Sequence, residues 1–333
     1  MHDSLLLVIV IVLVALIFDF INGFHDAANS VATIVATRVL TPVQAVVWAA
    51  FFKFIAAFFF HTGVAGTVGK GMVDLSMITS NVILAGLIGA IVWDLMTWWW
   101  GLPTSSSHAL FGGYAGAAIA AAGFKAIILS GWTKILIFIV VAPVLGMVLA
   151  YVLMIGIHWL FRESTPRMMD VHFRRLQLVS AAVFSYSHGS NDAQKTMGII
   201  TGVLVTSGYL KTFEVPVWVI IAAHAAIALG TMSGGWHIIR TMGTRLTRLK
   251  PRGGFCAETA AAFSILLSTY LHQPVSTTHV IAGAIAGVGS ITRPKAVRWR
   301  IAKSILWAWL MTIPASAAVG WLSHHVIHFL FGK

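Results

Sequence analysis

The chain has 333 residues, of which 58% are hydrophobic and only 10% are charged, with a mean hydropathy of +0.88. A soluble domain carries roughly 25% charged residues, so this composition excludes an ordinary soluble protein. The net charge of +12 would suit a nucleic-acid partner, but most basic residues lie between apolar runs. We therefore expect no nucleic acid. The single cysteine, Cys256, excludes an internal disulfide.

Many of the apolar runs approach about 20 residues, the length that crosses hydrocarbon as a helix. In chain order they lie at 5–21, 42–60, 77–99, 103–122, 133–160, 176–187, 190–206, 216–232, 255–271, 274–291 and 301–322. The first run has no basic residue before it and no small-x-small cleavage site after it, unlike a signal peptide. The sequence predicts an all-α polytopic membrane protein with about ten to twelve membrane segments.

Basic residues mark the expected cytoplasmic side. Fifteen of the 22 Lys and Arg residues gather in four places: Arg38; Arg162, Arg167, Arg174 and Arg175; Arg240, Arg245, Arg248, Lys250 and Arg252; and Arg293, Lys295, Arg298, Arg300 and Lys303. Because cytoplasmic connections carry the excess of positive charge, these four regions are predicted to lie inside. The N-terminus, the 61–76 connection and the C-terminus are then outside.

The sequence repeats itself at an offset of 171 residues. The segment at 103–116 reads PTSSSHALFGGYAG, and the segment at 274–287 reads PVSTTHVIAGAIAG. We divide the chain into a first repeat at 1–160, a cytoplasmic basic linker at 161–175 and a second repeat at 176–333. The charge pattern starts the two repeats on opposite sides, which predicts inverted repeats with broken or re-entrant half-helices, as in many secondary transporters. The glycine-rich ends of the two segments are interpreted as helix-packing surfaces.

Two related motifs, the signature pair, each place an aspartate in apolar surroundings, where burying its charge costs free energy. NGFHDAANSVAT at 22–33 and HGSNDAQKTMG at 188–198 align Asp26 with Asp192. A charged group at the bilayer centre costs roughly 2.5–3.5 kcal/mol on insertion scales. We expect the backbone to leave the helix at both places and start a new one, buried in protein or lining a wet cavity. Each aspartate could simply cap its new helix. Two of them, with polar neighbours, favour a binding site; the neighbours are Asn29, Asn191, Gln194 and Lys195.

Two hydroxyl trios follow a proline in each repeat. They are Ser105, Ser106 and Ser107, and Ser276, Thr277 and Thr278. Proline suits the first turn of a helix, because its missing N–H would be unpaired there. Hydroxyls cap such a start, and this end carries roughly half a positive charge. One trio alone is consistent with ordinary capping. Two facing trios predict a cradle of N–H and O–H donors for an anion.

The hydroxyl trios and the acidic residues together limit which substrates the site could bind. Either a cation lies between carboxylate and oxyanion, or the substrate donates its own proton to an aspartate. Hydrogen phosphate has such a proton near neutral pH and sulfate does not, which favours phosphate by roughly 1–3 kcal/mol. Asp26 and Asp192 would then handle the cation or proton. Glu258, whose counterpart at the same offset is Leu87, is a further candidate cation or proton site.

Other functions remain open at this stage. The chain could transport sulfate or a divalent metal. An intramembrane metal-dependent enzyme could use His25, Asp26, His188 and Asp192, but an enzyme has no need for mirrored halves. The sequence contains no Walker loop, zinc-type spacing or serine-hydrolase elbow. We therefore expect no enzyme activity and no cofactor, and assign no metal ligands.

Several motifs are similar to those of the inorganic phosphate transporter (PiT) family. They are GFHDAANSVAT at 23–33, LPTSSSH at 102–108, HGSNDAQKTMG at 188–198, GGWHIIRTMG at 234–243, GGFCAE at 253–258 and QPVSTTH at 273–279. The resemblance covers essentially the whole chain. It implies inverted halves that carry phosphate with a coupling cation, in a homodimer. It also implies that the trios hold phosphate, that Glu258 is functional and that six further residues line the site: Asp26, Asn29, Asn191, Asp192, Gln194 and Lys195.

Two departures bear on the coupling ion. Sodium-coupled relatives align acidic residues near Lys53 and Leu87, and losing two carboxylates removes oxygen ligands that a hard cation needs. A lysine at position 53 could stand in for a bound cation. With its short 161–175 connection, the chain resembles the low-affinity bacterial branch. We therefore expect proton symport in a bacterial inner membrane, partly of a neutral metal–phosphate complex, with sodium symport as the alternative.

Overall fold

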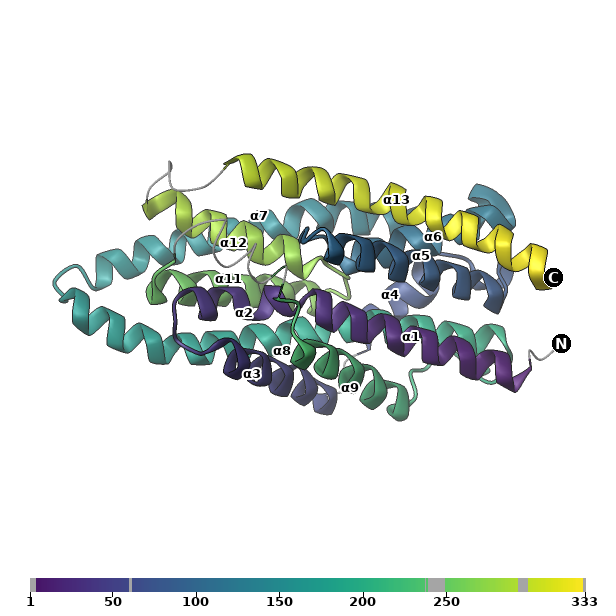
Figure 1. The fold of residues 1–333 in the computed structure, drawn as a ribbon, viewed down its shortest axis with the longest axis horizontal. Helices are drawn as coiled ribbons and strands as arrows, with labels where there is room; N and C mark the ends of the chain where they lie inside the picture. Colours follow the sequence, from purple (N-terminus) through teal and green to yellow (C-terminus); the bar gives the residue numbers. More distant parts are fainter. Residues whose placement is uncertain (1–3, 60–61, 237, 239–248, 293–298, 332–333) are drawn as a thin grey trace.

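The computed structural model describes residues 4–59, 62–236, 238, 249–292 and 299–331. Within these ranges the protein is helical, apart from its loops and an isolated antiparallel β-bridge between Val73 and Ile127. The helices lie side by side in an elongated bundle (Figure 1). The predicted all-α class is confirmed. Two basic groups and one motif fall partly outside the described residues, at Arg240, Arg245 and Arg248, at Arg293, Lys295 and Arg298, and in GGWHIIRTMG.

The first part of the chain forms seven α-helices and three short 3₁₀ turns. They are α1 (Leu5–His25), α2 (Ala27–Ala36), α3 (Pro42–Ile55), η1 (Ala56–Phe59), α4 (Gly63–Gly71), η2 (Leu75–Met77), α5 (Ser80–Trp99), α6 (Ser106–Ala122), η3 (Gly123–Ala126) and α7 (Leu129–Leu160). The second part contributes α8 (Pro166–Thr206), α9 (Val217–Ser233), α11 (Pro251–Tyr270), α12 (Thr277–Thr292) and α13 (Trp299–Phe331).

Among these helices, five stretches are long and apolar enough to cross a bilayer. They are Leu5–Ala36, Pro42–Phe59, Ser80–Trp99, Leu129–Leu160 and Leu306–Leu330. Two shorter apolar helices, Val217–Ser233 and Thr277–Ile291, accompany them. The chain is therefore a membrane protein with several apolar helices. The larger number of crossings stays a prediction.

The expected helix break is present at one aspartate and absent at the other. Asp26 alone separates α1 from α2, with φ −90° and ψ 7°. The break predicted at Asp192 is wrong, because α8 runs unbroken from Pro166 to Thr206 and joins the segments expected at 176–187 and 190–206. Residues 166–175, expected in the linker, are its first turns. Gly189 serves a different purpose here: a Cβ on it would lie 2.8 Å from Cα of Lys53, so it lets α3 approach α8.

The signature glycines mark two mirrored helix contacts. Gly23 on α1 lies against the backbone of Ile227 on α9, where a Cβ would be 3.0 Å from the Ile227 Cα. Gly189 on α8 lies against α3 in the same way. The first signature helix, α1, therefore packs closely on α9, and the second, α8, packs closely on α3.

The two Gly-rich helices also have matching partners. On α6, a Cβ at Gly112 would lie 3.0 Å from the Ile313 Cα of α13. On α12, a Cβ at Gly283 would lie 3.4 Å from the Pro143 Cα of α7. The helix-packing surfaces predicted from the sequence are confirmed. From the middle of the molecule, α6 and α12 extend toward opposite ends (Figure 1).

The termini lie together at one end of the bundle, and the turn between α7 and α8 lies at the other (Figure 1). That turn carries Arg162, and Arg167, Arg174 and Arg175 lie on the first turns of α8. The basic end is therefore opposite to the termini, in the arrangement that the charge pattern predicts.

Candidate functional site

Both hydroxyl trios form helix starts with the same local geometry. Ser105 caps α6, where its Oγ accepts a hydrogen bond from the His108 N–H at 3.3 Å. Ser276 does the same for α12, where its Oγ accepts from the His279 N–H at 3.2 Å. A serine at this position satisfies one of the N–H groups that a helix start leaves unpaired. The prediction that both trios begin helices is confirmed.

The two helix starts meet in the middle of the protein. The Thr278 hydroxyl donates to the Thr104 carbonyl oxygen at 3.1 Å, and the Ser107 hydroxyl donates to the Val275 carbonyl oxygen at 3.5 Å. Asn29 on α2 joins them, because its side-chain amide donates to Thr278 Oγ1 at 2.8 Å. Each trio is therefore in contact with the residue that precedes the other trio, which brings the two helix starts together. Ser106 is also buried there, and its Oγ makes no hydrogen bond of normal geometry with the residues that the structure describes.

Lys195 ties this junction to the second signature. Its Nζ lies 2.5 Å from Asp192 Oδ1 and 2.5 Å from Ser107 Oγ, and it donates to the Val275 carbonyl oxygen at 2.7 Å. Both charged side chains are fully buried. A buried charge is tolerated only when it is paired and hydrogen-bonded, and each of these groups satisfies the other.

The two aspartates share one cluster. His188 Nε2 lies 2.8 Å from Asp192 Oδ2 and 3.9 Å from Asp26 Oδ2. The Thr277 hydroxyl is 3.2 Å from Asp192 Oδ2 and 3.5 Å from Asp26 Oδ2. One ligand atom each of Asp26, His188 and Asp192 can be chosen so that all lie within 4.8 Å of one another, which is a grouping that could hold a cation.

Asp26 has a second set of neighbours toward α5. His25 Nδ1 lies 3.2 Å from Asp26 Oδ1, and its Nε2 lies 3.1 Å from the Thr97 hydroxyl. The Thr104 hydroxyl donates to Thr97 Oγ1 at 2.9 Å. A continuous set of hydrogen-bonding groups therefore runs from the aspartate cluster through His25 to α5 and to the segment before α6.

Three of the predicted site residues bind partners other than the trio hydroxyls and the aspartates. The Asn191 side chain binds the backbone N–H of Val275 at 3.2 Å and so positions the approach to α12. Gln194 accepts from the Val64 N–H at 2.9 Å, at the start of α4. Glu258 accepts from Thr33, Gln177 and Ser180 at 2.5, 3.0 and 2.5 Å. In the described part of the chain, no hydrogen bond or ion pair joins Glu258 to the trios or the aspartates.

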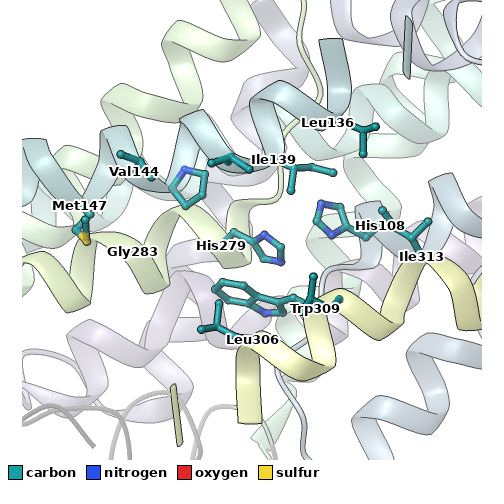
Figure 2. Close-up of a pocket in the computed structure, with 13 residues that line it drawn as sticks. His108, Leu136, Ile139, Val144, Met147, His279, Gly283, Leu306, Trp309 and Ile313 are labelled. Carbon is teal, nitrogen blue, oxygen red and sulfur yellow. The ribbon is translucent and has the colours of Figure 1, made fainter. Parts of the chain in front are cut away.

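Two histidines that occupy equivalent places in the repeated segments, one in PTSSSH and one in PVSTTH, line a separate, apolar cavity. His108 and His279 lie with ring centroids 4.5 Å apart, and His279 stacks on Trp309 at 3.6 Å. Figure 2 shows the three rings together at a cavity of about 470 Å³ among aliphatic side chains of α7 and α13. The histidines therefore belong to the packing behind the two helix starts rather than to the polar cluster.

The transport site predicted from the sequence did not include His188, which was named only for the alternative metal-dependent enzyme. His188 precedes Asp192 by four residues, a spacing that places two side chains on the same face of a helix. Because a break was expected at Gly189, the two residues were assigned to different elements. Its other nitrogen, Nδ1, lies 3.0 Å from the Ser30 hydroxyl and links the cluster to α2. Reading α8 as one helix would have found it.

The cluster can bind an anion and a cation side by side. Helix-start N–H groups, hydroxyls and the Lys195 ammonium are donors for an oxyanion. The two carboxylates and His188 can accept a proton or ligate a cation. Such mixed polar sites within a membrane are costly and are found where a substrate or ion passes.

Comparisons with known proteins agree with this chemistry. A model of the phosphate transporter family matches residues 22–320. The chain is 53% identical over 319 residues to a probable low-affinity inorganic phosphate transporter of Rhizobium meliloti, with 96% of each chain covered. A protein of the same name from Bacillus subtilis is 45% identical, with 99% of this chain and all of that one covered. The solved structure described as the sodium-dependent phosphate transporter is similar with a TM-score of 0.89 and 26% identity, over 98% of this chain and 100% of that one.

Proposed function

The chain belongs to the phosphate transporter family, a family of transporters rather than enzymes, and we propose that it imports inorganic phosphate by symport with protons. One observation carries the proposal: the starts of α6 and α12 meet beside Asp26 and Asp192. Phosphate would bind between the two trios, and the aspartates would accept its proton or a coupling cation. Asn29 and Lys195 would complete the phosphate site.

Phosphate differs from sulfate in that it carries a proton near neutral pH. Hydrogen phosphate can donate to a buried carboxylate, whereas sulfate would leave that acceptor unpaired, at a cost of roughly 1–3 kcal/mol. Arsenate has the same charge pattern as phosphate. We expect purified protein in liposomes to take up labelled phosphate, and unlabelled arsenate but not sulfate to compete. Competition by sulfate as strong as by arsenate would contradict phosphate selectivity.

Protons are proposed as the coupling ion because the chain already carries a buried positive charge on α3. Lys53 is fully buried on α3, and its ammonium donates to the Thr231 hydroxyl at 2.9 Å. The Lys53 ammonium already supplies a positive charge at this position, whereas a bound metal cation would need carboxylate oxygens as ligands there. Glu258 would act as an additional proton or cation site near α2. No resident cofactor is needed.

Sodium coupling is the second candidate. The solved relative is named a sodium-dependent transporter, and the grouping of Asp26, His188 and Asp192 could ligate a cation. A hard cation binds six or more oxygens more readily than a set that includes an imidazole. For that reason protons are preferred. A divalent metal carried with phosphate would also suit this grouping.

The mirrored helix contacts support the larger architecture. Gly23 against α9 and Gly189 against α3 are equivalent contacts in the two parts of the chain, as are those of Gly112 and Gly283. We infer two inverted repeats, 1–160 and 176–333, whose half-helices α6 and α12 enter from opposite sides. Alternating access would move one repeat-related bundle against another. A homodimer in the bacterial inner membrane completes the proposal.

A further inference from the structure

Asp94 on α5 is a buried acid that the proposed site does not use. Its side chain is wholly inaccessible to solvent, and within the described residues neither carboxyl oxygen has a hydrogen bond of normal geometry. The other buried acids near the signatures each accept at least one such bond; Asp19, for example, accepts from the Asn22 amide at 3.4 Å. Asp94 is therefore exceptional among them.

The surroundings of Asp94 connect it to both parts of the site. Its charged and titratable neighbours are His25 and Asp26 of α1, and α6 contributes the Ser106 hydroxyl. Among the residues that the structure describes, Ser106 also lacks a hydrogen bond of normal geometry. Thr97, one turn further along α5, donates to the Asp94 backbone oxygen at 3.2 Å and contacts His25 Nε2 at 3.1 Å. One carboxyl thus lies between a trio hydroxyl and the aspartate cluster.

An ionised carboxylate without partners is very costly to bury in a protein interior, and such a group is stabilised either by a bound cation or by a proton. Ser106 and Thr97 offer two hydroxyl oxygens beside the single carboxyl, too few for the coordination shell of a hard cation, and His25 offers only nitrogen. The Asp94 carboxyl and the neighbouring His25 imidazole both take up and release protons. We propose that Asp94 is a proton-binding site that accompanies phosphate through the membrane.

The step is a simple proton transfer. The Asp94 carboxylate takes one proton while the site is open to the outside and releases it to water when the site opens inside. No bond of phosphate is made or broken. The inference rests on the proposed function, and it assigns the coupling proton to a residue outside the phosphate cradle.

The test separates net uptake from exchange. Net uptake down a proton gradient requires that the carrier release its proton, whereas exchange of internal for external phosphate at equal pH does not. Purified wild type, Asp94→Asn, Asp94→Glu and the exposed control Asp170→Asn are placed in liposomes with labelled phosphate. We expect Asp94→Asn to lose at least about tenfold in net uptake and to keep exchange within about twofold of wild type. Asp94→Glu should recover net uptake, because it keeps a carboxyl, and Asp170→Asn should match wild type.

Each other result counts against the inference. If Asp94→Asn accumulates phosphate like wild type, Asp94 carries no coupling proton. If it loses exchange as well, and Asp94→Glu does not restore net uptake, Asp94 is needed for phosphate passage or for structure instead. A wild type that exchanges phosphate but accumulates it only with sodium overturns the proton site and leaves phosphate transport standing. A wild type that moves no phosphate in either mode overturns the proposed function itself.

Discussion

At the level of single residues, the site is held by a buried ion pair whose members also bind the two helix starts. Lys195 joins Asp192 to Ser107 and to the backbone at Val275. The pair therefore fixes α8 relative to α6 and α12. Since neither member is exposed, a neutral residue in place of Asp192 leaves the Lys195 ammonium without its counter-charge in the interior.

Replacing Asp192 with Asn tests this pair. The Lys195 ammonium would remain buried without its partner, and breaking a buried pair from one side costs about 3–5 kcal/mol. We expect phosphate uptake in liposomes to fall at least about a hundredfold. The control is Glu163→Gln, which removes the acid of an exposed pair with Arg162 (3.5 Å) and should leave uptake unchanged. Normal uptake by correctly folded Asp192→Asn protein would exclude the aspartate from the site.

Glu258 leads to a different expectation, because its partners are Thr33, Gln177 and Ser180 rather than the trios. A neutral glutamine replaces one acceptor oxygen by an NH2 donor, so the group that donated to that oxygen must reverse its hydrogen bond or lose it, and the site can no longer take up a proton. We expect Glu258→Gln to keep phosphate affinity within about twofold of wild type while net uptake falls. Equilibrium binding and uptake are measured on the same preparation. A tenfold loss of affinity would place Glu258 in the phosphate site.

The sequence was sufficient to find the residues whose role depends on local chemistry. Ser105 and Ser276 cap helices because a serine hydroxyl at a helix start can accept a hydrogen bond from a nearby backbone N–H. This interaction involves only residues that are close in the sequence. Asn191 and Gln194 could not be placed in this way. Their amides bind the backbone at Val275 and Val64, and only the tertiary packing determines which backbone lies within reach.

At the level of elements, the decisive feature is that α8 is continuous where a break was expected. Glycine before an acid was interpreted as a helix interruption. In the structure, Gly189 makes room for the backbone of α3, while His188 and Lys195 provide partners for Asp192 from the same helix. The sequence pattern alone did not distinguish a glycine that bends a helix from one that allows a neighbour to approach.

A pair of glycine substitutions on long helices tests this explanation. In Gly189→Ala the new Cβ would lie 2.8 Å from the Lys53 Cα, whereas in Gly156→Ala it would meet nothing within 4 Å. Overpacking costs about 1–3 kcal/mol, while alanine in an open helical position gains up to about 1 kcal/mol. We expect the melting temperature in detergent to fall for Gly189→Ala and not for Gly156→Ala. Equal melting temperatures would show that the close contact with α3 is unimportant.

At the level of the whole molecule, the two parts of the chain exchange partners: α1 packs on α9 and α8 packs on α3. The repeat of motifs predicted equivalent elements, and charge predicted their orientation. Neither could predict which helix of one part touches which helix of the other. That depends on the shapes of complete helix surfaces, of which the matched glycines are only one component.

The predicted orientation can be tested by labelling. Cys256 is buried and is replaced by Ala, and single cysteines are then introduced at the exposed positions Glu163 and Phe329. Because basic connections stay in the cytoplasm, an impermeant maleimide applied to intact cells should label Phe329→Cys and not Glu163→Cys. Labelling of both from outside would contradict an orientation with the termini outside and the α7–α8 turn inside.

The most direct test of the account is equilibrium binding of labelled inorganic phosphate to the purified protein, with wild type compared to Ser106→Ala and Thr277→Val. One phosphate held between α6 and α12 should lose a hydrogen bond in either variant, worth about 0.5–1.5 kcal/mol. We predict one phosphate per chain and an affinity reduced about two- to tenfold by each substitution. Unchanged affinity in either variant would contradict a single site shared by the two helix starts.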